Sequence, residues 1–265
     1  MISDTHCHLF FDDFLQDLNS VLERAWDSGI DRILMPGIDI PTSRQALELA
    51  ENHENLFVAV GTHPNNANSW KINSLDELSE LCSHPKVVAI GEIGLDYYRD
   101  RTPREIQQAA VIDQLDLAAE KNLPVILHCR QAFDDLYEFV SKWLSKTNLA
   151  SRLKIPGVFH SFEGTIEQAK KVIDINFYIG INGSITFPKA DERRDVVKNI
   201  HENYLLMETD APFLSPQSHR GRRNEPGYLP IIVDKVAEIK DRTPTEIAKI
   251  SSINANTIFD WGTVK

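Results

Sequence analysis

Short apolar runs alternate with longer amphipathic segments along the whole chain. The short runs have the length and the Val, Ile and Leu content of buried parallel strands. Eight strands are predicted, at residues 1–8, 32–38, 56–63, 87–92, 124–128, 157–160, 177–182 and 204–210. The longer segments have helical apolar spacing. They predict helices at residues 15–28, 42–52, 75–82, 104–121, 133–145, 166–173 and 193–201, and two more within 229–259, the second beginning at Thr243-Pro244.

Alternating strands and helices imply parallel strands joined by helical crossovers. An open doubly wound sheet alternates in the same way, but eight strands favour a closed (β/α)8 TIM-type barrel, formed as a single domain by residues 1–265. The placement of polar residues favours the barrel more strongly, because a barrel brings all strand ends to one mouth. Polar side chains close seven predicted strands, as His8, His63, Glu92, His128, His160, Asn182 and Asp210.

Two histidines, His6 and His8, stand one residue apart in the first predicted strand. Side chains at this spacing point to the same face, so both imidazoles can reach one metal ion. A His-x-His pair alone is a weak signal, since surface or core histidines also occur at this spacing; its place at a barrel strand end strengthens the metal interpretation. Cys7 faces the other way and is expected to be a packed residue.

Glu92 follows an apolar run in which a parallel strand should be buried. Burying an unpaired carboxylate is costly, so Glu92 needs a strong partner. A pair of metal ions is one such partner, because the two carboxylate oxygens can bridge them. The alternative is a buried salt bridge to Arg99 or Arg130.

His128 and His160 each close an apolar run, and Asp210 supplies a second carboxylate on the strand face that also carries Glu208. A lone histidine in such a place is more often a hydrogen-bonded core residue, but two at equivalent strand ends favour ligands. Two divalent ions that share a carboxylate and a water would use the whole set. The candidate metal ligands are therefore His6, His8, Glu92, His128, His160 and Asp210.

Seven motifs together resemble the TatD family of metal-dependent deoxyribonucleases, which belongs to the amidohydrolase-like barrels. The motifs are DTHCH (4–8), GTHP (61–64), GEIGLD (91–96), PVILHCR (124–130), HSFEG (160–164), ETDAP (208–212) and RNEP (223–226). The resemblance implies that one ion is held by His6, His8, Glu92 and Asp210, and the other by Glu92, His128 and His160. It also implies that Asp210 is the general base, with Glu92 and Glu208 as further catalytic residues.

The resemblance implies a divalent-metal-dependent hydrolase, above all a 3′–5′ deoxyribonuclease acting on single-stranded DNA ends, with RNA as a further substrate. The alternative is an ester or amide hydrolase on the same barrel, including a D-aminoacyl-tRNA deacylase. A non-catalytic metal-binding scaffold is disfavoured, because the full ligand set is kept together with Glu208 and His63. The imidazoles suit zinc or nickel, whereas the carboxylates accept magnesium or manganese, so the identity of the metal stays open.

Five residues around the strand ends are predicted to contact substrate: His63, Arg130, Arg222, Arg223 and Asn224. A planar guanidinium can hold a phosphate in a fork. The segment 219–226 is the most basic part of the chain and follows the last predicted strand, so a phosphate-gripping loop fits it.

Each of these contacts competes with a structural role for the same side chain. His63 could be a structural residue of the mouth, Arg130 could pair with Glu163 or Asp96, and Arg223 could pair with Glu208. Similarly, Trp70 could stack on a nucleobase or pack on its own barrel.

The net charge of −11 argues weakly against a nucleic-acid partner, but two divalent ions would add four positive charges at one spot. The composition, 42% hydrophobic and 25% charged, is that of an ordinary soluble protein. No membrane span and no secretory signal are recognised, so a cytoplasmic location is expected. The cysteines Cys7, Cys82 and Cys129 predict neither a disulfide framework nor a thiolate zinc site.

Overall fold

The computed structural model describes residues 1–71, 73–99, 101–147 and 153–261 of the chain. Its eight strands are parallel and are hydrogen-bonded in the order of the sequence. They are β1 (Ile2–Asp4), β2 (Ile30–Pro36), β3 (Leu56–Val60), β4 (Val87–Asp96), β5 (Val125–Arg130), β6 (Gly157–Phe159), β7 (Tyr178–Ile181) and β8 (Leu205–Met207). The predicted (β/α)8 barrel is confirmed; an open doubly wound sheet would reverse its strand order at a switch point.

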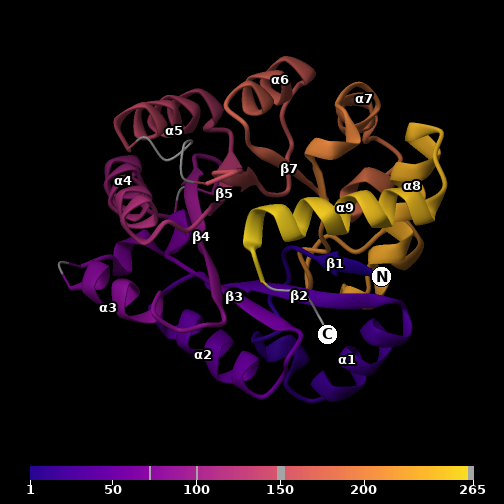
Figure 1. Cartoon of the computed structure of the whole chain (residues 1–265), viewed down its shortest axis with the longest axis horizontal. Coiled ribbons are helices and arrows are strands. Elements are labelled where there is room, and N and C mark those ends of the chain that lie inside the picture. The colour runs from indigo at the N-terminus through magenta and orange to yellow at the C-terminus, as the bar shows by residue number, and fades with distance from the viewer. Residues whose placement is uncertain (72, 100, 148–152, 262–265) are drawn as a thin grey trace.

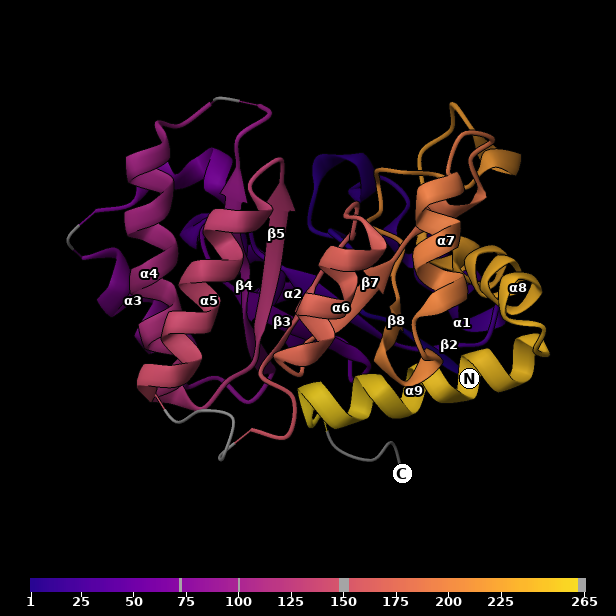
Figure 2. The ribbon, with the colours of Figure 1, turned by 90° about the horizontal axis from the view of Figure 1, so that it is seen from above.

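Helices cover the outside of the barrel (Figure 1), and α9 lies across the end opposite to that at which the strands finish (Figure 2). The helices are α1 (Leu18–Asp27), α2 (Ile40–Glu51), α3 (Ser74–Leu81), α4 (Arg104–Lys121), α5 (Phe133–Thr147), α6 (Ile166–Asp174), α7 (Asp191–Asn199), α8 (Leu229–Lys240) and α9 (Pro244–Phe259). Short 3-10 helices occupy Asp12–Phe14, Pro64–Ser69, Gly183–Thr186, Glu202–Tyr204, Gln217–His219 and Pro226–Tyr228. Within the described residues, none of the helices is long and apolar enough to cross a membrane.

A small hydrophobic cluster joins residues of β2 through β8 to the end of α9, and therefore lies inside the barrel. Ile126 and Val158 belong to it. Because alternate side chains of a strand share a face, His128 and His160, two positions further on, point into the same interior at its open end. The larger cluster fills the space between the strands and the surrounding helices. The polar residues at the mouth therefore lie directly above the apolar interior of the barrel.

The barrel closes along a seam between β1 and β8, beyond the ends of both strands. Backbone hydrogen bonds run from Thr5 N to Met207 O (3.2 Å), from Asp210 N to His6 O (2.8 Å) and from His8 N to Ala211 O (2.8 Å). Both strands are shorter than predicted, so the segments with His6, His8 and Asp210 follow the strands and pair as the seam.

A buried carboxylate supports this seam. Asp4 accepts hydrogen bonds from Thr209 N (2.9 Å) and Thr209 Oγ1 (2.6 Å). Burial raises the pKa of Asp4 to about 7 although these hydrogen bonds oppose the rise. The seam brings side chains from the two ends of the chain next to one another.

β4 extends four residues beyond its predicted end, to Asp96. Its register against β5 shifts between Ile90 and Ile93. Gly94 has a φ of +139°, and a Cβ at this position would collide with the backbone of His128. Glycine is the residue that tolerates both the conformation and the close approach. The irregular strand places two acidic side chains, Glu92 and Asp96, at the mouth.

Two buried glutamines of α4 hold the ends of β3 and β4. The Gln114 side chain accepts from Thr62 N (2.7 Å) and donates to Thr62 O (3.2 Å). In the same way, Gln107 accepts from Asp96 N (2.8 Å) and donates to Asp96 O (3.1 Å). Each amide pairs both polar groups of one backbone residue, as a neighbouring strand would. His63, next to Thr62, and Asp96 are thereby positioned from outside the barrel.

We expect Gln114→Ala to lower the free energy of unfolding by about 2–4 kcal/mol, because each buried backbone group left without a partner costs roughly 1–3 kcal/mol. Denaturant unfolding measures the change. The matched control is Gln45→Ala at an exposed position of α2, which should cost less than about 0.5 kcal/mol. Equal losses in the two variants would mean that the Gln114 hydrogen bonds add nothing to stability.

Candidate metal centre

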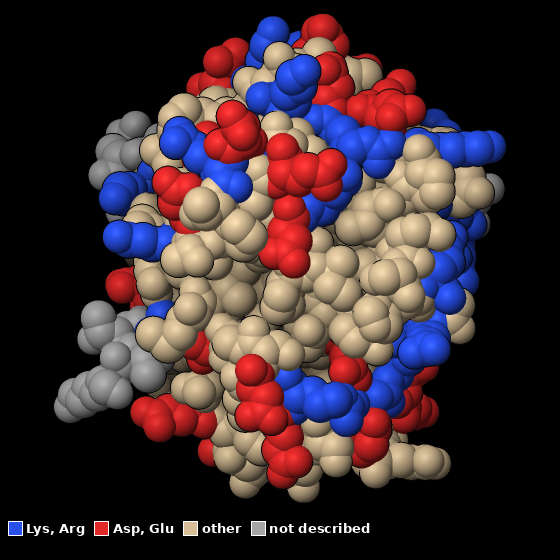
Figure 3. Space-filling model, turned by 90° about the vertical axis from the view of Figure 1, so that its right-hand side faces the viewer, with Lys and Arg blue, Asp and Glu red and all other residues tan. Residues whose placement is uncertain are grey.

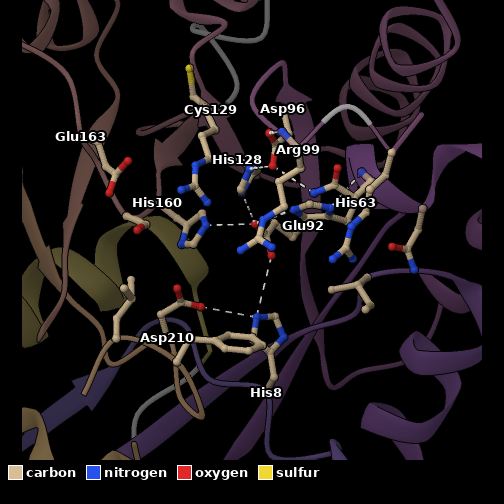
Figure 4. Close-up of a pocket in the computed structure, with 18 of the residues that line it drawn as sticks. His8, His63, Glu92, Asp96, Arg99, His128, Cys129, His160, Glu163 and Asp210 are labelled. Carbon is tan, nitrogen blue, oxygen red and sulfur yellow. Dashed lines mark hydrogen bonds and ion pairs between the residues drawn. The ribbon is translucent and has the colours of Figure 1, made fainter. Parts of the chain in front are cut away.

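Glu92 lies at the centre of the mouth, and its two oxygens face two different groups of side chains (Figure 4). The Nε2 atoms of His6 and His8 lie 3.2 Å apart. His6 Nε2 is 3.4 Å from Glu92 Oε2 and 3.8 Å from Asp210 Oδ1, and the corresponding distances from His8 Nε2 are 3.8 and 3.6 Å. Ligands at ~2.0–2.1 Å around a tetrahedral ion stand about 3.3 Å apart. These four side chains therefore fit one metal ion.

The second group surrounds the other oxygen of Glu92. His128 Nδ1 lies 2.8 Å from Glu92 Oε1, and His160 Nε2 lies 2.9 Å from the same atom. The His6 and His160 rings stack with centroids 3.8 Å apart, so the two groups touch. A carboxylate between two groups of imidazoles has the geometry of a bridging ligand.

Outer hydrogen bonds set the tautomers of two of these histidines, and a carboxylate lies near the outer nitrogen of a third. His8 Nδ1 donates to Pro36 O (3.0 Å), and His128 Nε2 donates to Asp96 Oδ2 (3.3 Å). His160 Nδ1 lies 3.4 Å from Glu208 Oε1. A proton on each outer nitrogen leaves the inner nitrogen with a lone pair toward Glu92, as metal ligation requires. The donor set thus fits resident metal ions.

His63 is oriented differently. Its Nδ1 accepts a hydrogen bond from Asn65 N (3.0 Å), and its Nε2 lies 3.5 Å from Glu92 Oε1. Burial lowers the pKa of His63 to about 3, which makes the ring neutral. Because Nδ1 is an acceptor, the one ring proton must be on Nε2. His63 therefore presents an N–H donor to the centre, which suits an oxygen atom of a substrate and does not suit a metal ion.

The cluster contains four buried carboxylates, those of Glu92, Asp96, Glu208 and Asp210. Burial alone would raise the pKa of Glu92, but the neighbouring imidazoles, chiefly His160 and His63, keep it well below the usual value. Burial alone would lower the pKa of His160, yet Glu92 and Glu208 raise it well above normal. The centre therefore stabilises positive charge, and two divalent ions would balance the four carboxylates.

A cavity of about 610 Å³ opens above this cluster. His8, Glu92, His128, His160 and Asp210 form its floor, with His63 beside them. Its walls carry four arginines, Arg99, Arg101, Arg130 and Arg220. Two of these stack on aromatic rings: Arg130 on Tyr98 and Arg220 on Phe187, each with its guanidinium carbon 4.2 Å from the ring centroid. Of the four arginines, the sequence predicted Arg130 as a contact residue; Arg220 lay within the predicted phosphate-gripping segment 219–226 but was not chosen individually.

The structure does not bring Arg222, Arg223 and Asn224 into the cavity wall. Arg223 forms a two-pronged ion pair with Asp17 (2.7 and 2.8 Å), so a pairing of Arg223 with Glu208 is wrong. Asn224 is buried and donates to the carbonyls of Thr209 and Phe213. Arg222 is exposed on the same loop. Contact of these three residues with substrate stays a prediction.

Neither Glu92 nor Arg130 forms the salt bridge considered for it from the sequence. The partners of Glu92 are histidines rather than Arg99 or Arg130. Arg130 lies over Tyr98 rather than in an ion pair with Glu163 or Asp96. The Glu92 carboxylate therefore stays available to cations, and the Arg130 guanidinium keeps its charge toward the cavity.

Two further side chains lie away from the cavity. Glu208 is 1% exposed and accepts from Ser161 N (2.5 Å), so it stands behind His160 as a positioning residue. Trp70 packs on its own barrel and donates to Asp113 Oδ2 (3.0 Å).

Asp96 and the extra arginines were missed as site residues for different reasons. Asp96 stands four residues after Glu92 at the end of the same strand, and this spacing could have indicated it. Arg99, Arg101 and Arg220 lie in loops, where no periodicity shows which way a side chain points. They could have been suspected only from their closeness to strand ends.

A barrel with this cluster at the carboxyl ends of its strands defines the class of metal-dependent hydrolases. Residues 3–260 match the family model described as TatD related DNase. The chain belongs to the TatD family, as its motifs predicted.

Relatives resemble the chain over nearly its full length. YabD of Bacillus subtilis, a metal-dependent hydrolase, is 39% identical, with 98% of this chain and 99% of YabD covered. The 3′-5′ ssDNA/RNA exonuclease TatD of Escherichia coli K12 is 33% identical, with coverage of 97% and 98%. The crystal structure of YjjV, a TatD homologue from E. coli K12, superposes with a TM-score of 0.90 at 34% identity and covers 98% of both chains.

Glu92→Gln should remove both metal ions together, because an amide cannot supply two anionic oxygens. Asp96→Asn should act more selectively: it weakens the acceptor behind His128 and should lower the affinity of that ion about 10–100-fold, with the His6–His8 group intact. Elemental analysis after dialysis against a weak chelator measures both effects. Asp134→Asn, at an exposed position of α5, is the matched control. Retention of two ions by Glu92→Gln would exclude a bridging role.

Proposed function

We propose that this hydrolase is a two-metal nuclease that removes nucleotides from the 3′ ends of single-stranded DNA, with RNA as a further substrate. The observation that carries the proposal is the shared carboxylate of Glu92 between two groups of imidazoles, below a cavity walled by arginines. The named activity of the E. coli relative supports the choice of substrate. Zinc, magnesium, manganese and nickel are the candidate ions. When bound, such ions polarise the phosphoryl oxygen and acidify water.

The side chains of the chain supply proton transfer and orientation. Asp210 lines the cavity, and its backbone takes a φ of +57°, which the seam bonds hold in place. Its carboxylate is placed to accept a proton from the attacking water. The water oxygen bonds to phosphorus and the P–O3′ bond breaks. A nucleoside 5′-monophosphate is released, and the O3′ oxygen stays on the shortened strand, where it takes up the proton that Asp210 accepted and becomes the new 3′-hydroxyl. The Nε2–H of His63 donates a hydrogen bond to a phosphoryl oxygen.

Positive charge around the cavity can hold neighbouring phosphates even though the whole chain is acidic. Acidic and basic side chains are interspersed over the face that carries α1, α7 and α8, and basic ones gather along its right-hand edge (Figure 3). Arg99, Arg101, Arg130 and Arg220 reach the cavity itself. Phosphate contacts of this kind position a strand without reading its sequence.

Asp210→Asn should reduce kcat on a short single-stranded oligonucleotide by roughly 10²–10⁴-fold, since it removes the proton acceptor and weakens one ion site. Steady-state kinetics with Mg²⁺, Mn²⁺, Zn²⁺ and Ni²⁺ measures the loss and identifies the active metal. Asp174→Asn, exposed on α6, is the control and should keep wild-type turnover.

The same preparation is assayed on double-stranded DNA, a D-aminoacyl-tRNA and simple esters. If the acyl substrates are hydrolysed and no nucleotides are released, the nuclease proposal is wrong and the protein is an ester or amide hydrolase.

Arg220→Ala should mainly raise KM, because a grip on a neighbouring phosphate acts equally in the ground and transition states. It should also flatten the salt dependence of DNA binding by somewhat less than about one unit of slope. Arg223→Ala tests the residue chosen from the sequence: its ion pair with Asp17 predicts kinetics near wild type. The opposite pattern, with KM raised only in Arg223→Ala, would assign phosphate binding to the 222–224 segment.

A further inference from the structure

A second cavity, of about 420 Å³, adjoins the first on the side of β5 and β6. The two cavities share the wall residues Cys129, Arg130, His160 and Glu163. His160 is also one of the candidate metal ligands. A group attached to a phosphate at the metal centre can therefore enter the second cavity directly, and its volume lies within the usual range for small-molecule sites.

The lining of the second cavity suits a planar, polar ring. Tyr98, Phe133 and Phe162 supply aromatic surface, and the amides of Gln131 and Gln168 supply hydrogen-bonding groups. Nucleobases bind proteins through this combination, by stacking on aromatic rings and by hydrogen bonds to amides at their edges. An aliphatic acyl group would need neither the stacked rings nor two amides.

Two of these groups are already oriented. Tyr98 is 56% exposed and carries the Arg130 guanidinium over its ring at 4.2 Å, so a stacked pair forms one edge of the cavity. Gln168 Oε1 accepts from Thr165 N (2.9 Å) at the start of α6. This bond holds the amide in place, and the Nε2 group remains a hydrogen-bond donor.

An acidic group stands at the junction of the two cavities. Glu163, which is labelled in Figure 4, lines both of them. Its carboxylate is ion-paired with Arg193. A carboxylate accepts a hydrogen bond from a free 3′-hydroxyl, whereas a 3′ oxygen that carries a further phosphate has no proton to donate. This wall therefore favours the end of a strand over its continuation.

We propose that the second cavity binds the terminal nucleoside of the strand, the one released on cleavage, with its base against Tyr98, Phe133 and Phe162 and its free hydroxyl toward Glu163. The inference rests on the proposed nuclease function and deepens it. It explains how a mouth open to solvent could act on the end of a strand. The site beyond the scissile phosphate has room for one nucleotide, and its Glu163 carboxylate is matched to the free hydroxyl that the last nucleotide carries.

The test compares three probes on metal-loaded protein by titration calorimetry: a deoxynucleoside 5′-monophosphate, deoxyribose 5-phosphate and inorganic phosphate. Stacking of one base should make the nucleotide bind about 10-fold or more tightly than the sugar phosphate. In Tyr98→Ala the ratio of the sugar phosphate's dissociation constant to that of the nucleotide should fall at least threefold. A change in the orientation of Arg130 affects both ligands through their phosphate and cancels in this ratio; inorganic phosphate measures that change separately. Phe162→Leu, checked for folding by thermal unfolding, should reduce the ratio in the same direction.

The matched control is Phe213→Ala. Phe213 is a similarly exposed aromatic residue (53%) that lines the first cavity only, after β8, which stands across the barrel from β4. The ratio should be unchanged in this variant. A ratio near one in the wild type, or a ratio lost in Phe213→Ala and kept in Tyr98→Ala and Phe162→Leu, overturns the proposal.

Hydrolysis of a single-stranded oligonucleotide by the same preparations separates the two levels of inference. If nucleotides are released but the nucleotide and the sugar phosphate bind equally well, the assignment of the second cavity is wrong and the nuclease function stands. If no nucleotide is released, the proposed nuclease function is itself wrong.

Discussion

The mouth of the barrel depends on one buried carboxylate. Glu92 is 3% exposed, and an ion taken out of water costs several kcal/mol unless positive charge compensates it. Imidazoles that lie in β5 or shortly after β1, β3 and β6 all converge on its two oxygens. The conformation of each of these segments therefore depends on the positive charge that surrounds the Glu92 carboxylate. Metal ions that bind only the folded chain also stabilise that fold.

Four arginines at and near the mouth differ in whether a carboxylate neutralises them. Arg24 and Arg223 are paired with carboxylates of Glu225 and Asp17, which cancel their charge. Arg130 and Arg220 lie against aromatic rings, which orient the guanidinium without neutralising it. An acidic protein can in this way keep a local positive field for a polyanion. The kind of partner indicates an arginine's role better than its distance along the chain from a ligand.

The parts of this structure that follow a period could be predicted from the sequence. Polar residues that close apolar runs located the carboxyl-terminal ends of the strands to within four residues, and hence the convergence of His128, His160 and Glu92. Loop residues follow no period, so within the basic segment 219–226 the sequence could not show that Arg220, rather than Arg223, lines the cavity. The extension of β4 to Asp96 depends on a backbone irregularity at Gly94 that no alternation rule describes. The second cavity is formed by side chains from several loops and appears only once these loops are folded.

The seam between β1 and β8 joins residues 205 positions apart, as in the contact of Asp4 with Thr209. His6 and His8 are therefore made about 200 residues before their partner Asp210. At roughly 5–20 residues per second, synthesis separates them by about 10–40 s. Throughout that interval the nascent chain carries two unshielded imidazoles that can take up a metal ion with incomplete coordination. The full set of ligands for the first ion site can therefore assemble only after Asp210 has been made.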